Sequence, residues 1–186
     1  KYILLRGSFR SQRPVRINKN LKSILVLFGG ADTNNFTLKA LKALDRIPEK
    51  FMVRIVMGKF FGFSDQVKDF LVKFSKPFHV YKDIKDDDEL IQIMRKNDLA
   101  LVSGGYTTSE LLRLGVPSII LSQNEIEDKR VFPNFPSTSF KYMGRGQRVS
   151  IKELRRAVRE LILDYTTRKQ LSLRARHVVD GKGLER

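Results

Sequence analysis

The sequence contains no cysteine, so neither a disulfide framework nor a thiolate metal site can form. No run of apolar residues reaches the roughly 20 that a membrane-spanning helix needs, and no secretory signal is visible. Internal repeats and low-complexity tracts are missing as well. The lack of cysteine fits a reducing compartment, and we therefore expect a cytoplasmic protein without a membrane span.

A surplus of positive charge marks the composition. The 186 residues include 36 Lys and Arg against 20 Asp and Glu, which gives a net charge of +16. Such a surplus attracts phosphate-bearing partners, whether nucleic acid, anionic lipid headgroups or a nucleoside diphosphate. The basic residues are spread along the chain, however, and no aromatic-interleaved basic motif of the common RNA-binding modules appears. We interpret most of the charge as a solvated surface, expect no nucleic-acid partner, and leave contact with an anionic surface open.

Short apolar segments alternate with helical patterns along the chain. The predicted strands are residues 24–28, 51–57, 78–81, 99–102, 117–121 and 140–142. Apolar residues at helical spacing predict helices around residues 38–44, 65–74, 86–95, 108–114, 125–131, 150–162 and 167–179. This alternation predicts an α/β fold with a doubly wound, mainly parallel six-stranded sheet and helices on both faces, a Rossmann-like arrangement. Ligands of such sheets bind beyond the carboxyl ends of the strands, where the strand order reverses.

The first 22 residues differ from the rest. They are basic and irregular after an apolar start at residues 2–5. We expect residues 1–22 to be a linker or the remnant of an N-terminal domain that this chain lacks, and residues 23–186 to form the α/β domain.

Two predicted strands end in a glycine pair that runs into a helix, at Gly29-Gly30 and at Gly104-Gly105. The first and fourth strands are neighbours at the switch point of the common doubly wound order, so both turns would line one crevice. Glycine lets the backbone approach a ligand closely, and the N-terminus of the following helix attracts anions. Each turn alone is more often only a tight connection, but the pair favours a bound diphosphate.

Acidic residues near these turns have more than one interpretation. Thr107 and Glu110 fit a capping box, in which the glutamate turns back to a backbone N–H. The alternative is that Glu110 reaches into the crevice and accepts hydrogen bonds from ribose hydroxyls. Asp32 would repel a diphosphate, so we interpret it as a helix cap, together with Asn34 or Asn35.

Several stretches resemble one known family. They are FGGADTNN at residues 28–35, SGGYTTSE at 103–110, LGVPS at 114–118 and DGKGLER at 180–186. They are similar to the UDP-sugar hydrolase of pseudaminic acid synthesis, a family that extends to the spore coat polysaccharide biosynthesis proteins. The opening YILLR at 2–6 resembles the segment that leaves the N-terminal domain in that family. The resemblance spans nearly the whole chain and implies the C-terminal, nucleotide-binding domain of the GT-B glycosyltransferase fold, whose more distant kin include the glucosaminyl transferase that makes lipid II.

The resemblance also implies a site. The residues expected to contact the nucleotide are Gly29, Gly30, Gly104, Gly105, Thr107, Thr108 and Glu110. In this arrangement the glycines lie near the phosphates, the threonines donate to the diphosphate, and the glutamate holds the ribose. Uracil would lie against main chain near residues 57–58 and Ile84. UDP or a UDP-sugar is therefore the expected ligand, and the protein's own N-terminal domain the expected partner.

This chain departs from the family pattern in two places. Family members usually carry Asn-Gln in the loop after the fifth strand, where this chain has Gln123, Asn124 and Glu125. That loop commonly faces the sugar, so the sugar and the reaction stay open. The catalytic histidine of the hydrolase belongs to the N-terminal domain. We expect this chain alone to be inactive and the full-length protein to be a nucleotide-sugar hydrolase or glycosyltransferase.

The chain shows no catalytic centre of its own. We predict that His79 is packed as a structural residue in an apolar strand, and that His177 lies at the surface. Neither accompanies a recognisable nucleophile motif, and no cluster has metal-ligand spacing, so we expect neither metal nor cofactor. The acidic run at residues 86–89 is interpreted as a solvated helix cap. Two alternatives remain: a basic module that binds nucleic acid or another polyanion, and a non-catalytic nucleotide-sugar sensor.

Overall fold

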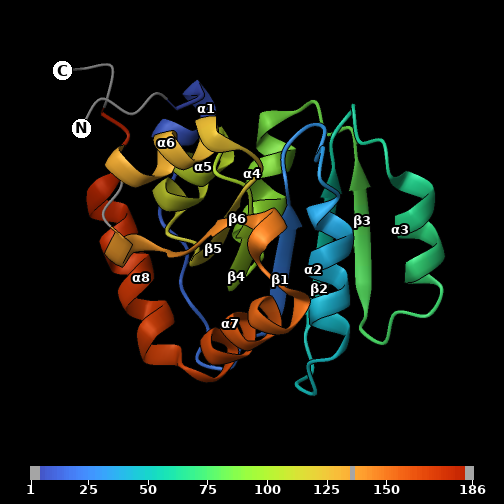
Figure 1. Ribbon diagram of the computed structural model, residues 1–186. Coiled ribbons are helices and arrows are strands. Elements are labelled where there is room, and N and C mark those ends of the chain that lie inside the picture. The colour runs from blue at the N-terminus through green and yellow to red at the C-terminus, as the bar shows by residue number, and fades with distance from the viewer. Residues whose placement is uncertain (1–4, 135–136, 183–186) are drawn as a thin grey trace.

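The structure, a computed structural model, describes residues 5–134 and 137–182. Its centre is a six-stranded sheet in the order β3-β2-β1-β4-β5-β6 (Figure 1). All neighbouring strands are parallel. The strands are β1 (Ser23–Leu27), β2 (Met52–Met57), β3 (Phe78–Lys82), β4 (Leu99–Val102), β5 (Ser118–Ser122) and β6 (Lys141–Arg145). The prediction of a doubly wound, parallel sheet of six strands is confirmed.

Helices cover both faces of this sheet. They are α1 (Gly7–Arg10), α2 (Phe36–Asp45), α3 (Ser64–Leu71), α4 (Asp87–Arg95), α5 (Tyr106–Leu114), α6 (Glu125–Asn134), α7 (Ile151–Leu163) and α8 (Tyr165–Val178), with short 3-10 turns η1 (Ser137–Ser139) and η2 (Gly146–Arg148). One apolar cluster joins the sheet to α2, α3 and α7, and the other joins it to α1, α4 and α5. No helix in the described part of the chain has the length and apolar character needed to cross a membrane.

The central strand β1 shows why the apolar runs are continuous. Ile24 and Val26 pack in the first cluster, whereas Leu25 and Leu27 pack in the second. Since a strand of a doubly covered sheet is buried on both faces, every position is apolar rather than every other one.

The sheet order reverses between β1 and β4. Strands β2 and β3 lie on one side of β1, and the chain then crosses to β4 on its other side. The carboxyl ends of β1 and β4 therefore flank the crevice in which such sheets bind their ligands. This places the glycine turns that follow β1 and β4 next to one another, as the sequence predicted.

The N-terminal segment packs onto the domain. The ring of Phe9 on α1 is fully buried, and Val15, Ile17 and Leu21 are buried after it. The first three of these side chains belong to the cluster that also contains residues of α4 and α5. Residues 5–22, part of the segment 1–22 that we expected to be a linker or the remnant of an N-terminal domain, thus pack against the α/β domain, while residues 1–4 lie outside the described residues.

Two details differ from the sequence expectations. Helix α5 begins at Tyr106, two residues earlier than predicted, so Thr107 lies inside the helix. The prediction that His79 is packed is wrong: its side chain is exposed, and its ring lies 4.4 Å from that of Tyr81. The reason is that β3 forms an edge of the sheet, where one strand side has no neighbour. His177 is exposed on α8 as predicted.

A buried arginine fastens the N-terminal segment to the last two helices. Arg168 on α8 is completely buried. Its guanidinium donates to the carbonyl oxygens of Leu161 and Ile162 in the last turn of α7, and to those of Asn18 and Lys19. A cation at a helix C-terminus satisfies carbonyls that the helix itself leaves unpaired.

We predict that Arg168→Met lowers the free energy of unfolding by about 2–4 kcal/mol, because methionine keeps much of the volume but leaves four carbonyls without these donors. Urea unfolding monitored by circular dichroism measures the change. The control is Lys169→Met, whose exposed side chain should be replaceable with little effect. Equal stability of the two variants would contradict the assigned role of Arg168.

Candidate functional site

The two glycine turns meet at the carboxyl ends of β1 and β4. Leu27 and Val102 are paired at the ends of these strands. A Cβ on Gly29 would lie 3.8 Å from the hydroxyl of Ser103, and Gly29 has a φ of +81° that favours glycine. Behind Gly30, the turn after β2 approaches so closely that a Cβ on Gly58 would lie 2.4 Å from the Cα of Gly30. Three strand ends therefore converge on one backbone-lined crevice.

Asp32 closes the amino end of α2. Its carboxylate accepts hydrogen bonds from the amides of Phe36 and Thr37 at 2.8 and 2.7 Å, and Asn35 accepts from the amide of Leu38. The interpretation of Asp32 as a helix cap is confirmed. Burial raises the pKa of this carboxyl above its ordinary value, despite the hydrogen bonds that favour the charged form. The first amides of α2 are consequently occupied by side chains of the protein itself.

Gln123 joins the loop after β5 to the first glycine turn. Its side chain is buried; the amide donates to Asp32 at 2.9 Å and to the carbonyl of Phe28 at 3.3 Å, and its oxygen accepts from Asn34 at 2.7 Å. Of the three residues expected to face a sugar, Gln123 therefore points inward, whereas Asn124 and Glu125 are exposed.

A carboxylate also lies at the second glycine turn. Glu127 on α6 accepts from the amides of Gly104 and Gln123, at 3.0 and 2.7 Å. Gly105 forms the N-cap of α5 without a side-chain hydrogen bond. Thr108 is fully buried and its hydroxyl donates to the carbonyl of Ser103. The structure thus places the two glycine turns side by side at the ends of β1 and β4 but turns Thr108 toward the protein interior.

Thr107 and Glu110 lie in a pocket beside this crevice. The pocket has a volume of about 450 Å³ and is lined by Leu5, Arg6, Tyr106, Thr107 and Glu110. Glu110 is 3% exposed and accepts from Arg6 Nε at 2.6 Å. This hydrogen bond to the Glu110 carboxylate raises the pKa of Arg6. The capping-box interpretation of Glu110 is wrong, because its partner is this arginine and not the start of α5.

Arg6 and Glu127 were missed as site residues by the sequence reasoning. Arg6 stands in the segment 2–6 that carries part of the resemblance, and its charge was the available signal. Glu127 lies four residues after Gln123, in the acidic first turn of α6. Acidic residues at the start of a helix are usually interpreted as a solvated cap. The small cavity near the proposed uracil position, about 190 Å³, is lined in part by Met57, Gly58 and Lys59.

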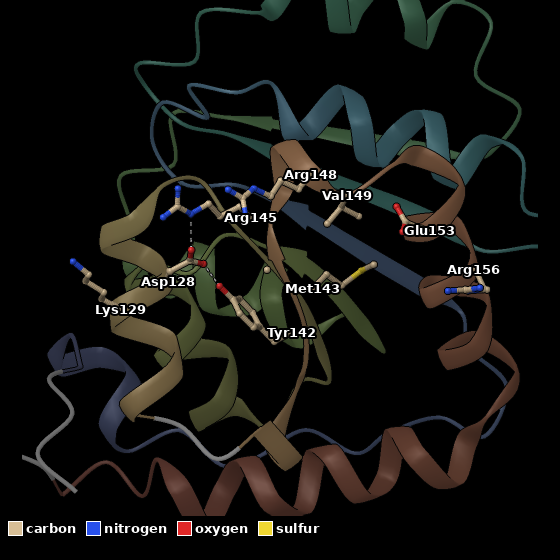
Figure 2. A pocket seen from close by; sticks show the side chains of 10 residues that line it. Asp128, Lys129, Tyr142, Met143, Arg145, Arg148, Val149, Glu153 and Arg156 are labelled. Atoms are coloured by element: carbon tan, nitrogen blue, oxygen red, sulfur yellow. Dashed lines mark hydrogen bonds and ion pairs between the residues drawn. The ribbon is translucent and has the colours of Figure 1, made fainter.

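A second, larger pocket lies between α6, β6, η2 and α7 (Figure 2). At one wall Tyr142 donates to Asp128, and Arg145 donates to the same carboxylate at 2.7 Å. Ser122 lies 2.9 Å from the Tyr142 hydroxyl. Burial, and then the hydrogen bond to Asp128, raise the pKa of Tyr142 to about 12. Although burial acts the other way, Tyr142 and Arg145 hold the pKa of Asp128 below its ordinary value.

Within residues 5–134 and 137–182, no group of three or more His, Cys, Asp or Glu side chains is placed to hold a metal ion. The acidic run at 86–89 instead opens α4, where Asp86 accepts from the amide of Asp88. This confirms its interpretation as a helix cap.

Comparison with curated proteins finds two relatives, while no family model matches the chain. The chain is 35% identical over 133 residues to an uncharacterized protein of Methanocaldococcus jannaschii, which covers 68% of this chain and 27% of that protein. It is 30% identical over 189 residues to the spore coat polysaccharide biosynthesis protein SpsG of Bacillus subtilis, covering 100% of this chain and 54% of SpsG. The chain thus spans about half the length of SpsG and about a quarter of the archaeal protein.

Solved structures share the fold at low sequence identity. MurG of Acinetobacter baumannii superposes with a TM-score of 0.74 at 12% identity, over 93% of this chain and 52% of MurG. Anabaena Alr3699/HepE, solved in complex with UDP-glucose, gives 0.64 at 14% identity over 88% and 48%. The C-terminal domain of the group 1 glycosyl transferase LpcC from Francisella tularensis gives 0.66 at 14% identity over 91% and 87%.

We predict that Asp32→Ala destabilises the protein by about 2–4 kcal/mol, because the amides of Phe36 and Thr37 and the side chain of Gln123 lose their acceptor. Urea unfolding measures the loss. Thr33→Ala, at the exposed neighbouring position, is the matched control and should change stability by less than about 0.5 kcal/mol. A similarly small change in Asp32→Ala would show that the carboxylate does not hold this corner.

We predict that Tyr142 ionises at a pH of about 12, in an ultraviolet absorbance titration of the folded protein. Its pKa is raised in the fold, so the stability that it contributes is complete below the ordinary tyrosine pKa of about 10 and is lost as the pH rises through the folded value. Tyr142→Phe should remove this late step and Tyr81→Phe should keep it. A titration unchanged by Tyr142→Phe would contradict the assignment.

Proposed function

Since the chain has the fold of the C-terminal domain of GT-B glycosyltransferases, we propose that it binds the nucleotide of a UDP-sugar in the crevice above β1 and β4. The full-length protein is then a sugar-nucleotide hydrolase or glycosyltransferase of polysaccharide or nonulosonate biosynthesis, working in the cytoplasm. The similarity to SpsG over the whole chain supports the pathway class, and the UDP-glucose complex of Alr3699/HepE supports the ligand class.

The observation that carries this proposal is the buried carboxylate of Glu110. This carboxylate is 3% exposed and borders a pocket, and Arg6 is its hydrogen-bond donor within the protein. Vicinal ribose hydroxyls are donors that match its remaining acceptor capacity. It lies one turn into α5, so a nucleotide whose ribose meets Glu110 brings its phosphates to the amino end of that helix.

The diphosphate belongs at α5 rather than at α2. Asp32 already accepts from the first amides of α2, whereas the N-cap Gly105 of α5 has no side-chain hydrogen bond and the nearby Glu127 carboxylate accepts from Gly104, ahead of the helix. The guanidinium of Arg6, 44% exposed beside the same pocket, is ion-paired with Glu110 and Asp87, so a phosphate that binds it takes the place of Asp87. We assign the phosphate contacts to Gly29, Gly30, Gly105 and Thr107. Thr108 supports this turn from below through its hydrogen bond to Ser103.

The remaining parts of the ligand follow from this placement. Uracil lies toward the turn after β2, near Gly58 and Ile84. The sugar lies toward the loop after β5, where Asn124 and Glu125 are exposed and Gln123 holds the loop in position. Glu127 currently accepts from the Gly104 amide, so a phosphate that took this amide would displace the carboxylate.

The catalytic base comes from a second domain. Large apolar side chains are exposed after three of the parallel strands: Phe60 after β2, Tyr106 after β4 and Ile126 after β5. All three follow the carboxyl ends of their strands, on the side of the glycine turns, which suits an interface that closes over the ligand. That domain brings the group that activates water or an acceptor hydroxyl. The leaving UDP is stabilised by backbone amides, Arg6 and the α5 dipole, so this chain alone binds without turnover.

We predict that UDP binds to this chain in isothermal titration calorimetry, and that Glu110→Gln weakens binding by about tenfold or more. The amide keeps the size of the side chain but offers one acceptor oxygen in place of two. Wild type should also prefer UDP to 2′-deoxy-UDP, and Glu110→Gln should narrow this preference. Glu89→Gln, an exposed glutamate on α4, is the control and should bind like wild type.

Two outcomes would contradict the proposal. One is the same affinity for UDP in Glu110→Gln as in wild type. The other is that single-stranded oligonucleotides bind more tightly than UDP, with a steep salt dependence and no effect of Glu110→Gln. The net charge of +16 would then explain the binding as general attraction of a polyanion to a basic protein. Binding of UDP-sugar without turnover by the full-length protein would instead favour a sensor.

A further inference from the structure

The pocket between α6, β6, η2 and α7 has its own chemistry (Figure 2). Its volume is about 850 Å³, which is within the range of roughly 300–1,000 Å³ that small-molecule sites occupy. Its cationic lining consists of Lys129, Arg145, Arg148 and Arg156. They come from four separate elements, so the fold, rather than a single basic run in the sequence, gathers them.

The acidic groups of this pocket are already engaged. Asp128 accepts from Tyr142 and Arg145. Glu153 accepts from the amide and the hydroxyl of Ser150, at 2.8 and 2.6 Å, in the capping box of α7. Both carboxylates are therefore turned to internal donors.

Two of the arginines remain available. Arg148 is exposed and forms no ion pair with any described residue. Arg156 is 76% exposed on its side chain, and the nearest carboxylate oxygen, of Glu160, is 3.9 Å away. Their guanidinium groups border the same hollow and are free to form bidentate contacts with an oxyanion.

The floor of the pocket is apolar. Met143 and Val149 line it and pack with the first apolar cluster, whereas Tyr142, the neighbour of Met143 on β6, points to the opposite side, toward Asp128 (Figure 2). An apolar floor with hydrogen-bond donors at its rim suits a pyranose ring, which has C–H groups on its faces and hydroxyls at its edge, and the arginines suit an acid group on that ring. We propose that this pocket binds an acidic sugar, with its carboxylate or phosphate held by Arg148 or Arg156, which lie at different ends of the pocket (Figure 2).

This site is separate from the nucleotide pocket. The two have no lining residue in common. They meet through α6, where Glu127 accepts from the Gly104 amide and the next residue, Asp128, accepts from Tyr142 and Arg145. The acidic sugar is thus a second ligand, an acceptor or an effector, and not a part of the UDP-sugar.

Titration calorimetry of this chain with glucuronate, glucose 6-phosphate and neutral glucose tests the site. We expect a dissociation constant of about millimolar for at least one of the two acids, as for a ligand of this size, and much weaker binding of glucose. The acid that binds more tightly identifies the anionic group. Binding of neither acid, or equal binding of glucose, would overturn the proposal.

The double variant Arg148→Ala/Arg156→Ala should weaken binding of the acid by about tenfold or more. The matched control is Lys152→Ala/Arg155→Ala, which removes the same charge near the start of α7 from residues that do not line this pocket. Equal losses in both variants would reduce the effect to general charge attraction and overturn the proposal. Thermal unfolding checks that both variants fold.

UDP distinguishes this proposal from the nucleotide site. The arginine double variant should bind UDP like wild type, and saturating UDP should leave the binding stoichiometry of the acid unchanged. Competition between UDP and the acid for one site would overturn the assignment of a separate pocket. If UDP does not bind at all, the proposed nucleotide site is wrong. The calorimetry with the two acids still decides whether the acidic-sugar site exists.

Discussion

The corner around the buried carboxylate of Asp32 determines how the crevice is built. This one side chain receives the first amides of α2 and the side-chain amide of Gln123, and so connects the turn after β1 to the loop after β5, on both sides of β4. Burying a charge is costly, and the raised pKa of Asp32 reflects that cost. The hydrogen bonds offset it and fix two walls of the crevice before any ligand arrives, which lowers the entropy that binding must overcome.

The same arrangement gives the two helices that follow the glycine turns different properties. At α2 the carboxylate of Asp32 accepts from the first amides of the helix itself. At α5 the carboxylate of Glu127 accepts from the Gly104 amide ahead of the helix, and the N-cap Gly105 has no side-chain hydrogen bond. Between them, α6 directs two consecutive carboxylates to opposite sides: Glu127 to the glycine turn and Asp128 to Tyr142.

The sequence carried the architecture because the strands of a doubly covered sheet are short, uniformly apolar and closed by glycine, as at residues 24–30 and 99–105. The adjacency of β1 and β4 followed from the general order of such sheets.

Contacts between residues far apart in the chain could not be predicted from the sequence. The hydrogen bond between Arg6 and Glu110 crosses 104 positions, so the local capping pattern of Thr107 and Glu110 suggested the wrong partner. The exposure of His79 depended on β3 lying at an edge, which its own apolar sequence does not encode. Gln123 looked like a loop residue because its three partners lie on the far side of the crevice.

Strands β3 and β6 form the two edges of the sheet. Because all strands are parallel and the sheet does not close, β3 and β6 each present one row of unpaired backbone groups, the kind of surface on which a second molecule can add a strand. Lys82 on β3 is exposed, whereas on β6 Lys141 pairs with Glu160 of α7 and Arg145 pairs with Asp128 of α6. A copy of this chain that approached the β6 edge would therefore meet side chains that the protein has already tied to two neighbouring helices.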